Sequence, residues 1–139
     1  MTIDTLIHTV AVALRPLLTV RVEECWRTVA SDEPVVYVEG NMIAGELGAN
    51  IGKLRDGDLA LDVMIEWPWD NKRATYAEFI AAVEVVRLWV RGHRDLDDNT
   101  RKGKHGDISL MRVGRPGATK GTYLLAIVPI MYSHRQADP

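Results

Sequence analysis

The segment Asp58–Trp67, DLALDVMIEW, alternates apolar and polar side chains along most of its length. In a β-strand, successive side chains point to opposite faces of the sheet. One face of this strand would carry only apolar groups: Leu59, Leu61, Val63, Ile65 and Trp67. The other face would carry the carboxylates of Asp62 and Glu66. We therefore predict a strand with one buried and one wetter face, in a sheet that helices cover on one side.

A first amphipathic helix is predicted over Ile3–Leu18. On a helical wheel its apolar residues share one face: Ile3, Leu6, Ile7, Val10, Leu14 and Leu17. Thr2 is placed to be the N-cap, because its hydroxyl can accept from a free N–H of the first turn. Pro16 should end or kink the helix near its last turn.

A second helix is predicted over Tyr76–Arg91, with Thr75 and Glu78 as a capping box and Gly92 just beyond its end. Its apolar residues cover well over half of the circumference, so one arc would stay wet in a monomer. Val85, Leu88 and Trp89 are the candidate residues of a subunit interface on this arc. The alternative is that the first helix or a loop covers it.

The remaining β-prone segments complete the predicted sheet: Thr19–Glu23, Val35–Glu39, Asp107–Val113 and Thr122–Tyr132. The last of these is apolar on both faces, which is typical of a strand in the middle of a sheet or at an interface. Pro129 lacks an N–H, so pairing should lapse there. We predict a single α/β (α+β) domain over residues 1–139: a mostly antiparallel β-sheet with two α-helices packed on one face.

Composition places the chain among ordinary globular domains. It has 139 residues and a net charge of −2, so the whole molecule is not a generic nucleic-acid binder. The single cysteine, Cys25, cannot form an internal disulfide, and we expect a buried or half-buried thiol. The N-terminus lacks the basic region of a signal peptide, and the longest apolar run, Tyr123–Tyr132, is too short for a membrane helix. These features predict a soluble protein that is made in the cytoplasm.

No residue pattern indicates catalysis, a metal or a cofactor. The four histidines lack metal-ligand spacing, no serine lies in a nucleophile elbow, and Gly45–Gly57 lacks the spacing of a phosphate-binding loop. One enzymatic alternative rests on acidic residues. Asp58, Asp62 and Glu66, followed by Asp70-Asn71-Lys72, resemble the metal-binding carboxylates and the lysine of a metal-dependent nuclease. These residues lie on or next to a single strand, and this placement argues against a nuclease site. We therefore expect that the carboxylates are solvated and that the protein is not an enzyme.

The segment His93–Gly106 is polar and modestly basic, with Leu96 as its one apolar side chain. It can bury almost nothing to offset the entropy of ordering, so a mobile loop is predicted. Four cations could contact a partner or the phosphates of nucleic acid: Arg94, Arg101, Lys102 and Lys104.

The order of elements resembles the tail terminator (tail completion or neck) proteins of long-tailed bacteriophages. The stretches that carry this resemblance are LALDVMIEWPW (59–69), TYAEFIAAVEVVRLWV (75–90) and GTYLLAIVPIMY (121–132). Proteins of that family are small α/β subunits that form a ring, usually a hexamer, at the end of the tail tube. The resemblance is one of pattern, because the family has no invariant catalytic motif to match.

The resemblance implies a structural virion protein of the neck and tail, assembled in the host cytoplasm. Its partners would be further copies in a homohexameric ring, the tail tube protein and the head–tail connector, with DNA passing through the ring. The basic segment would then face the lumen or a partner. Two alternatives stay open: a metal-dependent nuclease-like enzyme and a monomeric adaptor of the same fold.

Overall fold

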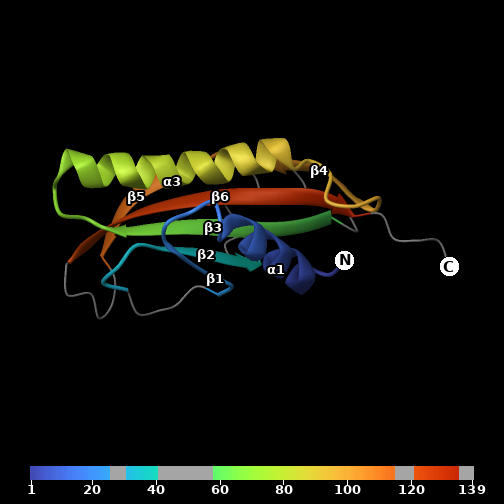
Figure 1. Cartoon of the computed structure of the whole chain (residues 1–139), viewed down its shortest axis with the longest axis horizontal. Helices are drawn as coiled ribbons and strands as arrows, with labels where there is room; N and C mark the ends of the chain where they lie inside the picture. The colour runs from blue at the N-terminus through green and yellow to red at the C-terminus, as the bar shows by residue number, and fades with distance from the viewer. Residues whose placement is uncertain (26–30, 41–57, 115–120, 135–139) are drawn as a thin grey trace.

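The computed structural model describes residues 1–25, 31–40, 58–114 and 121–134 of the chain. Two helices and six strands lie within these ranges (Figure 1). In chain order they are α1 (Ile3–Leu14), β1 (Arg21–Glu23), β2 (Val35–Gly40), β3 (Asp58–Pro68), α3 (Arg73–Gly92), β4 (Thr100–His105), β5 (Ser109–Gly114) and β6 (Thr122–His134). The glycine-containing stretch Gly45–Gly57 lies outside the described residues.

The strands form one six-stranded sheet in the order β1-β2-β3-β6-β4, with β5 also paired to β6. Every pairing is antiparallel except that of β1 with β2. The long strands β3 and β6 pair from Asp58↔Ser133 to Pro68↔Tyr123 and form the centre of the sheet. The predicted mixed α/β fold with a mostly antiparallel sheet is confirmed.

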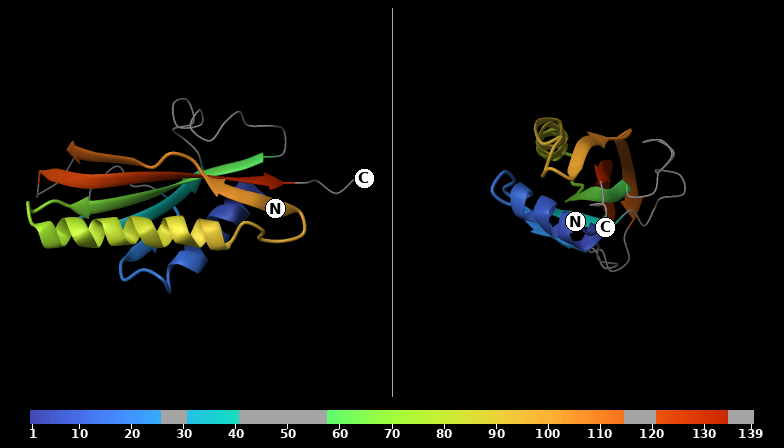
Figure 2. Two further views of the ribbon diagram at one scale, coloured as in Figure 1. Left: turned by 90° about the horizontal axis from the view of Figure 1, so that it is seen from above. Right: turned by 90° about the vertical axis from the view of Figure 1, so that its right-hand side faces the viewer.

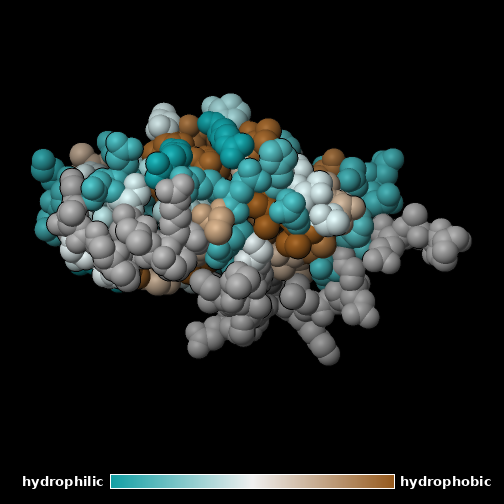
Figure 3. All heavy atoms as spheres, turned by 90° about the horizontal axis from the view of Figure 1, so that it is seen from below, coloured by the Kyte–Doolittle hydropathy of each residue, from teal (hydrophilic) through white to brown (hydrophobic). Residues whose placement is uncertain are grey.

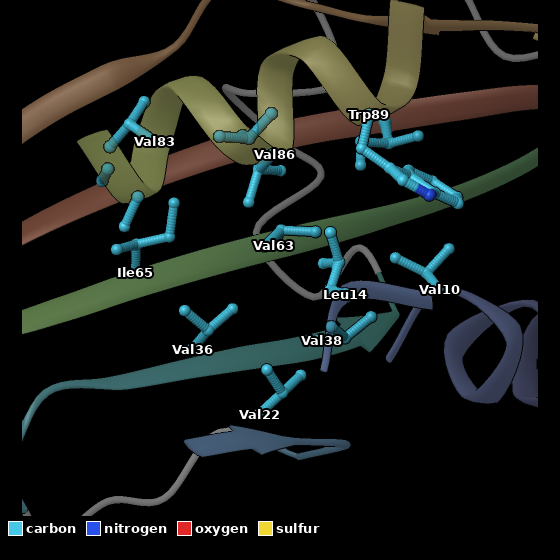
Figure 4. Close-up of a cluster of buried hydrophobic side chains, with 14 of the residues drawn as sticks. Val10, Leu14, Val22, Val36, Val38, Val63, Ile65, Val83, Val86 and Trp89 are labelled. Carbon is cyan, nitrogen blue, oxygen red and sulfur yellow. The ribbon is translucent and has the colours of Figure 1, made fainter. Parts of the chain in front are cut away.

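Both helices lie on the same face of this sheet (Figure 2). The main core fills the space between them and the strands, as the aliphatic side chains in Figure 4 show. Alternate residues of β3 supply the sheet side of this core, including the fully buried Leu61, Val63 and Ile65. The apolar face predicted for β3 is therefore confirmed. The helices contribute buried residues to the same core, including Leu6, Val10 and Leu14 of α1 and Phe79, Val83 and Val86 of α3.

Pro129 marks a break at one edge of the sheet. β5 pairs with β6 up to Ser109↔Ile127, and β4 pairs with it from His105↔Ile130 onward. The Pro129 carbonyl accepts from the Gly106 N–H at 2.9 Å, so its missing N–H would also face this edge. The ladder passes from one strand to the other at the residue that has no donor, as the sequence predicted.

The start of α1 agrees with the prediction, but the helix ends at Leu14 and not at Leu18, and the start of α3 also differs. Thr2 caps α1, and its hydroxyl accepts from the Thr5 N–H at 3.2 Å. The capping box predicted at Thr75 is wrong, because α3 begins at Arg73 with Lys72 as the N-cap. Asp70 instead binds the Lys72 N–H at 3.0 Å, so a turn before the helix uses the side chain that is placed to accept.

The expectation of a wet second face on the sheet is also wrong. Asp62 is fully buried and Glu66 is 1 % exposed. A second, smaller apolar cluster lies on this face: Val35, Tyr37, Met64, Leu125 and Ile127. β3 lies in mid-sheet, so neighbours from β2 and β6 flank each of its carboxylates. Alternation showed where the side chains point, but it did not show what surrounds them.

The predicted loop His93–Gly106 is a strand in its second half. β4 pairs with β6, and the turn before it is closed by hydrogen bonds from Leu96 and Asp97 N–H groups to the Thr100 carbonyl. Gly103 makes this possible, because a Cβ there would lie 2.2 Å from the ring of the buried Tyr132. The backbone ladder orders a segment that has little apolar surface of its own.

Candidate functional site: three interaction surfaces

An apolar groove of about 460 Å³ separates α3 from the segment that follows α1. Leu17, Leu18 and Val20 form one wall, and Trp67 and Pro34 lie between the walls. The wall on α3 is formed by Glu78, Ala81, Ala82 and Val85. Leu88 continues this helical stripe and is 56 % exposed. The groove therefore extends an apolar surface beyond the core.

The three predicted interface residues of α3 separate into two groups. Val85 is half-buried on the groove wall, and Leu88 is exposed. Trp89 is 6 % exposed, and its side chain points from α3 toward the sheet (Figure 4). Its ring stacks on His93 with 4.7 Å between centroids. Trp89 is thus a core residue, and its candidacy for the interface is wrong, whereas Val85 and Leu88 are available to a partner.

Two exposed apolar side chains lie on β5 at the edge of the sheet, and as consecutive strand residues they point to opposite faces. Leu110 is 51 % exposed and Met111 is 39 % exposed. Arg112 follows them, and its guanidinium lies 5.6 Å from the centre of the Trp69 ring. The sequence predicted this strand, but it did not predict that Leu110 and Met111 would be exposed. The residue pattern does not show that β5 lies at an edge of the sheet.

One face of the molecule, seen from below relative to Figure 1, shows how exposed apolar side chains are distributed (Figure 3). In the space-filling view of Figure 3, apolar side chains reach the surface in separate groups that polar residues border. Large contiguous apolar patches, unlike single exposed apolar side chains, are typical of surfaces that contact other molecules.

The four predicted basic residues are all exposed, but they do not form one group. Arg101 pairs with Asp95 at 3.5 Å, and the Lys102 N–H donates to the same carboxylate at 3.3 Å. These contacts, with the backbone bond first, hold the pKa of Asp95 below its ordinary value. Arg94 and Lys104 instead line a hollow of about 350 Å³ at the end of α3, together with Arg91 and His105. Sequence reasoning missed the last two, since only the β4 pairing brings them together.

The carboxylates of β3 lie inside the protein. Neither oxygen of Asp62 has a hydrogen-bond partner within the described ranges. Burial, with the nearby charge of Glu39, raises the pKa of Asp62 to about 6. Asp58 is half-buried at the start of the strand, and Asp70 is exposed beyond its end. The expected row of solvated carboxylates therefore does not exist on β3.

The other chemically active side chains are dispersed. Cys25 is exposed, so the predicted buried or half-buried thiol is wrong. His8 binds Glu24 at 3.0 Å on the surface. His134 contacts Thr100 at 3.1 Å. Among the residues that the structure describes, no three histidine, cysteine or acidic side chains are arranged to hold a metal ion.

No model of a known protein family matches this chain, and a search of curated proteins finds no similar sequence. Within the described residues, no helix has both the length and the apolar character needed to cross a membrane.

Proposed function

We propose that the protein is a structural virion subunit that forms a ring, as tail terminator proteins of long-tailed bacteriophages do. The observation that carries the proposal is the presence of two exposed apolar surfaces at different places on one small domain. They are the groove wall with Val85 and Leu88, and the face of β5 that carries the exposed Leu110, with Arg112 on the same face. The fold, which is a mostly antiparallel sheet with two helices on one face, agrees with the resemblance in element order.

Two different patches favour contact between unlike surfaces of neighbouring copies. Such heterologous contacts close into a ring when the rotation between subunits allows it. The charges of the two surfaces are also complementary. The acidic Glu78 lies in the groove, and the basic Arg112 lies on β5 next to the exposed apolar residues. We therefore propose that β5 of one copy docks along the groove of the next. The tail tube protein and the head–tail connector would bind the two rims of the ring.

Light scattering after gel filtration tests the contact. We expect a closed oligomer for the native protein and monomers for Leu88→Lys and for Leu110→Lys. An equal mixture of these two variants should give a dimer, because one intact groove then meets one intact β5. A native protein that is monomeric at every concentration would overturn the ring and favour the monomeric adaptor.

A charge exchange identifies the docking partners. Glu78→Arg and Arg112→Glu should each weaken assembly, and the variant that carries both changes should recover it. No recovery would mean that the two surfaces do not meet. The assembled ring should then cap the open end of a tail tube, which electron microscopy of purified tubes can reveal.

The enzymatic alternative has its own test. If the protein were a metal-dependent nuclease, it would cleave duplex DNA when the two are incubated with Mg²⁺. We expect none, and we expect Asp70→Ala to behave like the native protein. Metal-dependent cleavage that Asp70→Ala abolishes would replace the structural role by a catalytic one.

A further inference from the structure

The hollow at the end of α3 has a composition unlike the rest of the surface. Its lining combines three cationic side chains and one imidazole with little else: Val90, Arg91, Arg94, Gly103, Lys104 and His105. The lining comes from two elements, the last turn of α3 with the residues just after it, and β4, which Figure 1 and Figure 2 show side by side.

The cations of the hollow form no ion pair with a carboxylate of residues 1–25, 31–40, 58–114 or 121–134. Arg91, Arg94 and Lys104 are exposed, and no acidic group of the described ranges lies within ion-pair distance of them. The hydrogen bond from Arg87 lowers the pKa of Glu84, and the charge of Arg91 lowers it further. The Lys102 N–H lowers the pKa of Asp95, and the charge of Arg94 lowers it further.

These neighbouring carboxylates are already engaged elsewhere. Glu84 accepts from the Arg87 Nε at 3.0 Å, and Asp95 accepts from the Lys102 N–H and from Arg101. Asp97 binds the Asn99 N–H at 2.8 Å in the turn before β4. Positive charge therefore remains in excess at the hollow, although the chain as a whole has a net charge of −2.

The backbone around the hollow is held in place before any ligand arrives. The Gly103 N–H donates to the Arg94 carbonyl at 2.7 Å, which ties β4 to the end of α3. The Tyr132 hydroxyl donates to the His93 carbonyl at 2.6 Å from below. These bonds use main-chain atoms of the lining residues, so their charged side chains stay free for a ligand.

We propose that this hollow binds a phosphate group, with Arg91, Arg94 and Lys104 as its charged contacts. Two guanidinium groups offer paired N–H donors that match phosphate oxygens, and the lysine adds a third charge. A favourable interaction with the C-terminal end of the α3 dipole can explain the position of Arg91. It cannot explain Arg94, which lies beyond the helix, or Lys104, which lies on strand β4. A single phosphate group carries up to two negative charges and several acceptor oxygens, so it can contact all three cations at once, whereas a single carboxylate carries one charge and two oxygens. The proposal does not depend on ring formation.

Two sources can supply this chemistry: a free polyphosphate or the backbone of a nucleic acid. Calorimetric titration of the full chain with tripolyphosphate, and separately with a short DNA duplex, distinguishes them. We expect Arg94→Gln/Lys104→Gln to weaken binding by about tenfold or more, since charged hydrogen bonds are lost. For DNA, the slope of log affinity against log salt should also fall by about 2.

A matched control removes the same charge outside the hollow. Lys72→Gln/Arg73→Gln changes two exposed cations at the start of α3, about 28 Å from the hollow. We expect its affinity to stay within about twofold of the native value. Circular dichroism verifies that both double variants fold.

Binding of tripolyphosphate alone would identify a free phosphate as the ligand, and binding of DNA alone would identify the nucleic-acid backbone. Either result supports the site if only the hollow variant loses affinity. Equal losses in the two double variants would overturn it, because they would reflect diffuse charge. Failure to bind either probe at low salt, or equal affinity for poly-glutamate, would overturn it as well.

Discussion

The two faces of β3 are both buried, yet they are built from different chemistry. The face under the helices presents only apolar side chains, which pack against α1 and α3 in the main core. The opposite face combines Met64 with the buried carboxylates of Asp62 and Glu66. The first face adds stability through apolar burial, whereas the second includes an acid whose ionised form is disfavoured.

This difference shows what sequence alternation measures. Alternation sets the direction in which each side chain leaves the strand. It does not report how many strands flank it or whether other parts of the chain lie above it. A carboxylate in a central strand can thus be buried even where the pattern is that of a half-exposed sheet.

Trp89 tests the helix-side core with the largest expected effect. Trp89→Ala should lower the free energy of unfolding by about 3–5 kcal/mol, because a large buried ring leaves a cavity. Urea denaturation followed by circular dichroism gives this value. A loss below about 1 kcal/mol would mean that Trp89 is not packed in the core.

A substitution at Gly103 tests how closely the helix side of the sheet is packed near β4. Gly103→Ala would place a methyl group 2.2 Å from the Tyr132 ring, so something must shift. We expect a loss of about 1–3 kcal/mol, as for other overpacked sites. Gly92→Ala is the matched control, since nothing lies within 4 Å of its added Cβ. It should be neutral or slightly stabilising, and similar losses in both variants would contradict the close approach.

Much of this fold could be predicted from the sequence, because its strongest signals are local. The alternation in β3 and the wheel of α1 each follow from one continuous segment. Residues 100–105 gave no such signal, since β4 owes its order to pairing with the distant β6. The hollow could not be predicted for the same reason: Lys104 joins Arg91 only through that pairing.

Asp62 tests the opposite face through pH. Burial raises its pKa from 3.8 to about 6, so the folded protein holds this proton more tightly than the unfolded chain. The resulting stability is present below about pH 4 and is lost as the pH rises through about 6. Asp62→Asn should therefore be more stable than the native protein by about 1–2 kcal/mol at pH 7.5, with a smaller difference at pH 4.

Denaturation of both proteins across this pH range gives the comparison. The native-to-variant difference is needed because Glu84 and Asp95 have lowered pKa values and act in the opposite direction. The exposed Asp98→Asn is the control and should change nothing measurable. A constant difference between pH 4 and 7.5 would mean that Asp62 does not titrate with a raised pKa.

Leu88 tests where the helix-side core ends, with the smallest expected effect. It adjoins Trp89 in sequence, but it is 56 % exposed while its neighbour is 6 % exposed. Leu88→Lys should change the free energy of unfolding of the isolated subunit by no more than about 0.5 kcal/mol, as exposed substitutions usually do. The new cation would follow Glu84 by four residues and lie in the last turns of α3, and both features favour it. Denaturation at a concentration where the native protein is monomeric measures the free energy of unfolding of the subunit without any contribution from assembly. A loss of 2 kcal/mol or more would place Leu88 inside the core and would remove the groove wall as a surface for a second copy.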